Sequence, residues 1–187
     1  MTSKGLLRKA ALVQGKTLQF RDATISDAAF ILSLRVDEGK SRYISPIKGG
    51  IADQQAWLHR YVQMDDQAYF IIEYGGEPIG TVRLYDSKDE SFCWGSWVLA
   101  SNRPNHAAIE SALMVYSYAL DHLGFDKAHF DVRKGNENVW QFHERFGARR
   151  VDESELNFYY EIDRASIQVS RNRYRRYLQE SVSVIFY

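Results

Sequence analysis

One segment of the chain combines a histidine with a helix-forming apolar pattern, from Asn136 to the glycine at position 147. An imidazole has an ordinary pKa of about 6.5, so His143 can donate a proton from its cation or a hydrogen bond from its neutral ring. Proton donation to a leaving group is the chemistry this residue type supplies best. His143 also borders the apolar face formed by Val139, Phe142 and Phe146, where many histidines are only packed. The sequence leaves both roles open.

A second candidate segment, Arg103–Ala108, precedes a long apolar helical pattern. The first amides of a helix lack intrahelical partners and carry partial positive charge, which favours a bound phosphate. The small side chains of Ala107 and Ala108 permit close approach, and Arg103 can add a charge-assisted contact. Pro104 removes one donor. The segment predicts an anion-binding loop, with an ordinary strand-to-helix connection as the alternative.

Other reactive residue types are sparse. Asp37, Glu38 and Glu73 are the candidates for a general base that collects a proton from an amine, and each is otherwise a surface carboxylate. The single cysteine, Cys93, has no neighbouring His/Asp pattern that would make it a nucleophile. Since no Cys/His cluster has metal-ligand spacing, we expect no metal site.

The elements that must position these residues alternate between strand and helix patterns. Strands are predicted at 18–21, 69–74, 78–85, 92–99, 128–132 and 156–162, and helices from Ser26 to Arg35, from Asp53 onward, over 109–123 and over 138–146. Gly75-Gly76 suits a tight hairpin turn, and Gly124 and Gly147 suit helix ends. This order predicts an α/β fold with a mixed sheet.

Composition bounds the class of protein. The chain has 187 residues, of which 45% are hydrophobic and 26% charged, and Lys+Arg equals Asp+Glu at 24 each. That composition excludes disordered and collagen-like chains, offers no global charge for nucleic acid, and contains no apolar run long enough to span a membrane. We expect a basic arm over 1–17, a central domain over 18–163, and a basic helix with an apolar tail over 164–187. The tail either adds an edge strand or packs on a second subunit.

The order of elements and the two segments resemble the GNAT acetyltransferase superfamily, over about Leu18 to Ile162. The loop Arg103–Ala108 resembles the acetyl-CoA pyrophosphate loop (Gln/Arg)-x-x-Gly-x-(Gly/Ala), with His106 where the family prefers glycine. The segment Asn136–Gly147 resembles the family's Asn-x-x-(Ala/Ser)-x-x-(Leu/Phe)-(Tyr)-(Glu)-(Lys/Arg)-x-Gly segment. The resemblance implies a GNAT-like mixed, mostly antiparallel sheet with flanking helices, to which this chain adds a C-terminal helical tail.

The resemblance also implies acetyl-CoA as cosubstrate, direct acetyl transfer to an amine, and no metal. His143 holds the slot of a tyrosine that protonates the leaving thiolate. No motif identifies the general base, and Glu38 is our candidate because it lies near the presumed acceptor cleft. The residues implied to hold acetyl-CoA are Trp97, Val98, Leu99, Arg103, His106, Ala107, Ala108, Asn136 and Val139. Arg35 and Tyr43 are implied to bind the acceptor.

The chain is similar to the branch that acetylates amino sugars linked to nucleotides, and also to the branch that acetylates N-termini of ribosomal proteins. We favour the amino sugar, because the acceptor loop lacks the acidic run that a basic protein substrate would favour. Two further functions stay open: a non-catalytic CoA-binding module, and an RNA-associated protein that uses the arginines over 164–176. We further expect a cytoplasmic protein, with a homodimer as one possible assembly.

Overall fold

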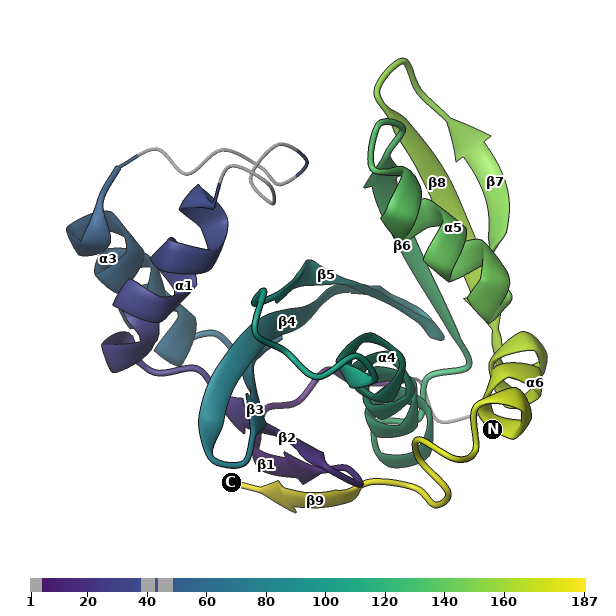
Figure 1. Ribbon diagram of the computed structural model, residues 1–187, viewed down its shortest axis with the longest axis horizontal. Helices are drawn as coiled ribbons and strands as arrows, with labels where there is room; N and C mark the ends of the chain where they lie inside the picture. The colour runs from purple at the N-terminus through teal and green to yellow at the C-terminus, as the bar shows by residue number, and fades with distance from the viewer. Residues whose placement is uncertain (1–4, 38–42, 44–48) are drawn as a thin grey trace.

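A computed structural model describes residues 5–37, 43 and 49–187, and these form one nine-stranded sheet with helices on both faces (Figure 1). The strand order is β7-β8-β6-β5-β4-β3-β2-β1-β9. Among the pairings of the described strands only β5 with β6 is parallel, which confirms a mixed, mostly antiparallel sheet. The strands are β1 Ala10–Gln14, β2 Leu18–Asp22, β3 Ala68–Tyr74, β4 Glu77–Lys88, β5 Ser91–Leu99, β6 Lys127–Arg133, β7 Arg149–Glu153, β8 Asn157–Asp163 and β9 Ser183–Phe186.

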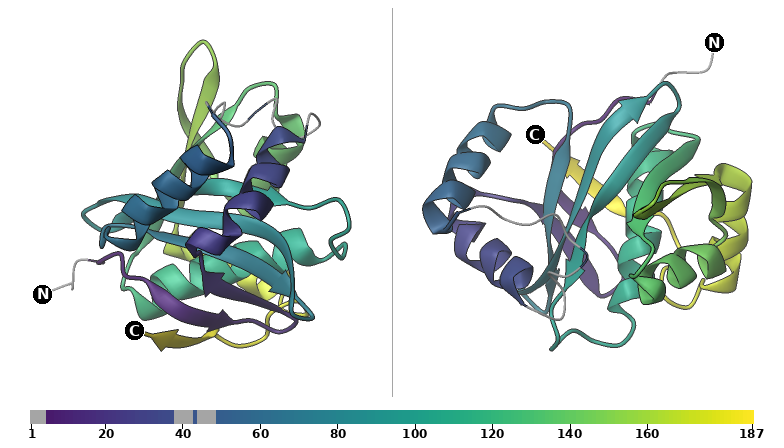
Figure 2. Two further views of the ribbon diagram at one scale, coloured as in Figure 1. Left: turned by 90° about the vertical axis from the view of Figure 1, so that its left-hand side faces the viewer. Right: turned by 90° about the horizontal axis from the view of Figure 1, so that it is seen from above.

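The helices divide between the two faces of the sheet. They are α1 Ala28–Val36, α3 Ile51–Val62, α4 Ala107–Ser117, α5 Glu137–Phe146 and α6 Arg164–Arg173, with a 3-10 turn at Ile25–Asp27 and a π-helical turn at Tyr118–His122. Figure 2 shows α1 and α3 on one side of the sheet and α4, α5 and α6 on the other. This arrangement leaves each face of the sheet with its own apolar cluster.

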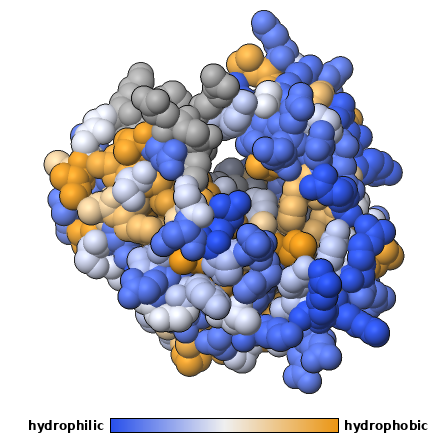
Figure 3. All heavy atoms as spheres, viewed as in Figure 1, coloured by the Kyte–Doolittle hydropathy of each residue, from blue (hydrophilic) through white to orange (hydrophobic). Residues whose placement is uncertain are grey.

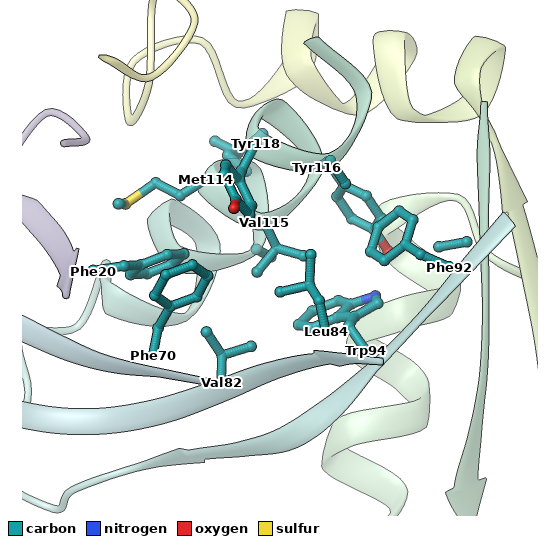
Figure 4. Packing of buried hydrophobic residues seen from close by; sticks show 14 of the residues in the cluster. Phe20, Phe70, Val82, Leu84, Phe92, Trp94, Met114, Val115, Tyr116 and Tyr118 are labelled. Carbon is teal, nitrogen blue, oxygen red and sulfur yellow. The ribbon is translucent and has the colours of Figure 1, made fainter. Parts of the chain in front are cut away.

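The larger cluster lies between the sheet and α4. Strand residues such as Phe70, Leu84 and Trp94 point toward Val115 and Tyr116 of α4, and all five are buried (Figure 4). All the α4 residues except Ala108 and Ile109 are buried, as expected of a helix that is apolar nearly all round. The smaller cluster lies under α1 and α3 and consists of Ala23, Ala28, Ile31, Leu58, Tyr61, Tyr69 and Ile71.

Segments near both ends of the chain join the sheet, so the expectation of a solvated basic arm is wrong for Ala10–Gln14. These residues form β1, in which Ala10 and Val13 are fully buried. Strand β9 pairs antiparallel with β1 at the sheet edge, so the structure shows the edge-strand alternative for the tail. Strand β7 was not predicted from the sequence, because all five of its residues are exposed and carry no apolar alternation.

Two predicted helix starts are wrong by a few residues. Ser26 is not the N-cap: a carboxylate oxygen of Asp27 accepts from the Thr24 amide at 2.7 Å, and α1 begins after this turn. Asp53 lies in the first turn of α3 and accepts from the Gly50 amide at 3.0 Å. Gly147 ends α5 with a φ of 110°, which confirms its predicted left-handed cap.

Candidate active site

The candidate site begins where β5 and β6 separate. The two strands pair only over Ser91–Cys93 and Lys127–His129, although β5 continues to Leu99 and β6 to Arg133. A bulge in β5 accompanies the separation: Ser96 has a φ of 47°, and its carbonyl accepts from the Thr81 hydroxyl at 2.8 Å. Bulges bend a strand and end its pairing, so this one opens the sheet.

A cavity of about 430 Å³ lies at this opening. Figure 3 shows the surface hollowed between the α1 side of the molecule and the side formed by α5 and β8. The cavity is lined by Tyr43, Trp97, Val98, Leu99, Arg103, Ala108, Asn136, Asn138, Val139 and Phe142. These residues come from the end of β5, the start of α4, the first turns of α5, and the segment between α1 and α3.

The cavity unites most of the residues that the resemblance implied for acetyl-CoA. Tyr43, expected at the acceptor, lines the same cavity as Asn136. A Cβ on Gly135 would lie 3.0 Å from the Tyr43 ring, so Tyr43 stands against the loop that leads into α5. Two lining residues, Asn138 and Phe142, were not predicted as site residues. Phe142 stood in the apolar stripe of α5, where periodicity alone suggests only packing.

His106 and Ala107 do not line the cavity. The His106 backbone is right-handed, with a φ of −82°, so this position requires no glycine. Its Nε2 lies 2.8 Å from the Thr17 hydroxyl. The fully buried Glu110 accepts from the amides of Thr17 and Leu18 at 2.6 and 2.9 Å. His106 thus belongs to a polar cluster that attaches the start of α4 to the β1–β2 turn.

The wall formed by β5 presents backbone donors to the cavity. The Ala100 amide donates to the Ile79 carbonyl of β4 at 2.7 Å. Because successive amides of a strand point to opposite sides, the Leu99 amide faces away from β4, toward the opening. A fixed, outward amide such as that of Leu99 can polarise a carbonyl. On the same strand, Trp97 is held by a hydrogen bond from its Nε1 to the Ser111 hydroxyl at 3.1 Å.

His143 lies one layer behind this wall. Its side chain is only 5% exposed, and its ring centroid is 5.9 Å from that of Trp97 and 5.7 Å from that of Phe142. Burial lowers the pKa of His143 to about 3, so the ring is neutral at pH 7. The prediction that His143 can donate a proton as a cation is therefore wrong, and only its neutral ring can act as a donor.

None of the described carboxylates lines the cavity, so none is placed there as a general base. Glu38 lies outside the described residues. Glu73 is buried and accepts from Arg21 Nε and Gln19 Nε2 at 2.6 Å each. Arg35, expected at the acceptor, is half-buried in the last turn of α1 and does not line the cavity.

Three further findings bear on the chemistry. Burial raises the pKa of the Cys93 thiol to about 11, which keeps it protonated. The described residues contain no group of three or more side chains suited to hold a metal ion. None of the described helices has both the length and the apolar character needed to cross a bilayer.

Comparisons with known proteins identify the family of the chain. A family model described as an acetyltransferase (GNAT) domain matches residues 17–149. A solved structure described as apo FdhC, a nucleotide-linked sugar GNAT, is 37% identical with a TM-score of 0.79, covering 93% of this chain and 99% of that one. Among curated proteins, no match was found.

Two other solved structures share the fold at lower identity. A GCN5-related N-acetyltransferase from Brucella melitensis has a TM-score of 0.78 at 14% identity and covers 94% of this chain and 88% of that one. A spermidine N-acetyltransferase from Vibrio cholerae, in complex with CoA and spermine, has a TM-score of 0.72 at 15% identity and covers 81% of this chain and 98% of that one.

Proposed function

This chain belongs to the GNAT acetyltransferase family, and on that premise we propose that it transfers the acetyl group of acetyl-CoA to the primary amine of an amino sugar linked to a nucleotide. The observation that carries the proposal is the cavity, which gathers the end of β5, the start of α4 and the first turns of α5 in one place. The amino-sugar acceptor is supported by the 37% identity to the nucleotide-linked sugar GNAT over nearly the whole of both chains.

The residues present fit acetyl-CoA. The first-turn amides of α4 and the exposed Arg103 suit its pyrophosphate, and the outward amide of Leu99 suits a carbonyl. Asn136 and Val139 form the facing wall for a narrow, mostly apolar arm. Bound acetyl-CoA supplies an activated acyl carbon. There the amine forms a C–N bond and the C–S bond breaks, so the amine loses a proton and the sulfur gains one.

His143 is the candidate to assist the departing sulfur as a neutral hydrogen-bond donor. Its Nδ1 is buried and has no hydrogen-bond partner among the described residues, whereas Nε2 is not among the buried atoms that lack one. Because a buried N–H without an acceptor is rarer than an under-satisfied acceptor, we assign the ring proton to Nε2. A neutral ring protonated at Nε2 can donate a hydrogen bond to the sulfur without any cationic intermediate on the ring.

The competing functions predict different partners. Two of the five arginines over 164–176, the segment that suggested RNA, are paired within the protein: Arg164 with Asp126 at 2.8 Å, and Arg171 with Asp121 at 2.9 Å. This pairing lowers the charge available to RNA. A peptide N-terminus as acceptor has no such observation in its favour, and peptides are therefore included in the assay as competing substrates.

The test is a calorimetric titration with acetyl-CoA, CoA and dephospho-CoA, followed by an assay of thiol release. We expect micromolar binding of acetyl-CoA and of CoA, and weaker binding of dephospho-CoA, which lacks the 3′-phosphate. We expect acetyl transfer to UDP- and dTDP-linked amino sugars and no transfer to peptides with a free N-terminus or to spermidine. Transfer to peptides alone would refute the acceptor, and the absence of acetyl-CoA binding would refute the enzyme.

A further inference from the structure

A half-buried arginine on β4 has no counter-ion among the described residues. The neighbours of Arg83 along the strand, Val82 and Leu84, point into the core beneath α4 (Figure 4). Strand alternation therefore places Arg83 on the opposite face, the side covered by α1 and α3. Its guanidinium lies 5.2 Å from the ring centroid of Trp57 and 4.6 Å from that of Tyr85.

The contacts of Arg83 use only part of its hydrogen-bonding capacity. Its Nε donates to the side-chain oxygen of Gln67 at 2.6 Å, and Gln67 is buried. Within the described part of the chain, no hydrogen bond or ion pair engages its two Nη groups. Neither Nη is among the buried atoms that lack a partner, so both reach solvent. Arg83 therefore keeps unused donors that solvent can reach, on a guanidinium that lies near two aromatic rings.

Burial of this cation is energetically costly. Loss of hydration lowers the pKa of Arg83, and the nearby charge of Asp66, which raises this pKa, offsets the effect only in part. No carboxylate among the described residues lies within ion-pair distance of Arg83. Arg21, on the same side of the sheet, provides the contrast: it is paired with Asp27 at 2.8 Å and with Glu73 at 2.6 Å. Of these two arginines, Arg21 is paired directly with two carboxylates, whereas Arg83 has no direct counter-ion among the described residues and is therefore the one available to bind an anion.

Arg83 does not line the cavity, but its backbone lies opposite the part of β5 that leads to it. In the pairing of β4 with β5 it is opposite Gly95, the residue before the bulge at Ser96. A Cβ on Gly95 would lie 3.0 Å from the Tyr85 hydroxyl, so glycine leaves room for Tyr85 to lie over the strand. The backbone of Arg83 therefore lies opposite β5 two residues beyond Cys93, the last residue of β5 that pairs with β6.

We propose that Arg83 binds the diphosphate of the acceptor through its two Nη groups, with Trp57 and Tyr85 holding the guanidinium plane. This inference rests on the proposed function, because it assigns the anion to a nucleoside diphosphate that carries the amino sugar. Paired donors in one plane match two phosphate oxygens, which an ammonium group cannot do. Arg83 is thus a residue that determines acceptor specificity and takes no part in proton transfer.

The experiment titrates the full chain with UDP and with dTDP by calorimetry, with uridine and thymidine as ligands that lack the phosphates. Three variants are compared with the wild type: Arg83→Gln, Arg83→Lys, and Arg60→Gln, an exposed arginine of α3. We expect at least tenfold weaker nucleotide binding for Arg83→Gln, at least threefold weaker binding for Arg83→Lys, and no change for Arg60→Gln. The nucleosides should bind wild type at least tenfold more weakly than the nucleotides.

Arg83→Lys is included as a variant that should fold even if Arg83→Gln does not, because it keeps a cation and a donor for Gln67. Thermal melts accompany every titration. Equal nucleotide affinity in wild type and folded Arg83→Lys, or no nucleotide binding to wild type, would overturn the inference. A parallel titration with acetyl-CoA separates the two proposals: we expect the same affinity in all four proteins. If acetyl-CoA does not bind, the proposed function fails, while the nucleotide titration still decides the role of Arg83.

Discussion

The imidazole of His143 lies against the ring of Phe130, with 4.3 Å between the two ring centroids. This contact joins α5 to β6 just beyond the point where β6 leaves β5. The ring of Trp94 from β5 lies 5.2 Å from the same imidazole. One neutral ring therefore connects the two strands that separate and the helix that closes the cavity between them. Its protonation bears on both stability and catalysis.

Stability should fall in acid because of His143. Its pKa is lowered from 6.5 in the unfolded chain to about 3 in the fold, so only the unfolded chain gains the proton between these values. The contribution is fully present above pH 6.5 and is lost as pH falls toward 3. At pH 5 the loss is about 2 kcal/mol. Urea unfolding at pH 7.5 and pH 5 should show a pH dependence smaller by that amount in His143→Phe. Equal pH dependence in both proteins would mean that the ring is protonated in the fold.

Activity should depend on His143, although the pH profile of kcat should show no titration of this histidine. We expect His143→Phe to lower kcat about 100-fold, the effect of losing one oriented donor, with the Kd of acetyl-CoA unchanged. Because the neutral ring does not titrate between pH 5 and 9, the kcat profiles of both proteins should have the same shape. A kcat within threefold of the wild type would restrict His143 to packing.

Arg103 should contribute to acetyl-CoA binding. It is exposed at the mouth of the cavity, and its Nη1 bonds the Ala100 carbonyl of its own loop, at 3.1 Å. Arg103→Ala should weaken binding of acetyl-CoA by about 1–3 kcal/mol, with the effect shrinking at high salt. Arg60→Ala, at an exposed site on α3, is the matched control and should leave the Kd unchanged. Unchanged affinity in Arg103→Ala would remove Arg103 from the site.

Removal of the Glu110 carboxylate should strongly destabilise the fold. It is fully buried and accepts from two backbone amides and the Thr17 hydroxyl. Glu110→Ala leaves those donors buried without an acceptor, so the free energy of unfolding should fall by about 3 kcal/mol. Glu137→Ala, at an exposed position in the first turn of α5, should cost less than about 1 kcal/mol. Chemical denaturation of both variants at pH 7 checks this difference.

Gly80 should be intolerant of any side chain. A Cβ there would lie 2.5 Å from the Val98 carbonyl oxygen, which is backbone and has no rotamer to change. Gly80→Ala should therefore displace the end of β5, cost about 1–3 kcal/mol of stability and weaken acetyl-CoA binding. Gly50→Ala is the control, because a Cβ at Gly50 meets no described atom within 4 Å. Equal melting temperatures and affinities for the two variants would contradict the crowding.

The elements that could be predicted from the sequence are those with a local signal. The apolar stripe of α5 and the glycine after it identify both the helix and its end. The long core helix was predicted in the right place, and so were the strands whose apolar residues alternate. Strands β1, β7 and β9 have no apolar alternation of this kind, so they depended on partners distant in the chain: Leu12 of β1 pairs with Arg21 of β2 and with Ile185 of β9.

The site residues, like the elements, could be predicted from the sequence only where a local motif marks them. Motif positions such as Asn136 and Arg103 could be named from the sequence, because a loop and a helix start have local chemistry. The sequence could not show that Tyr43 reaches the same cavity, because loops bring distant residues together only through the packing of the elements around them. Nor could it show that His143 is neutral or that Arg83 lacks a counter-ion among the described residues. Both depend on which groups surround a side chain in the fold and not on what precedes or follows it in the chain.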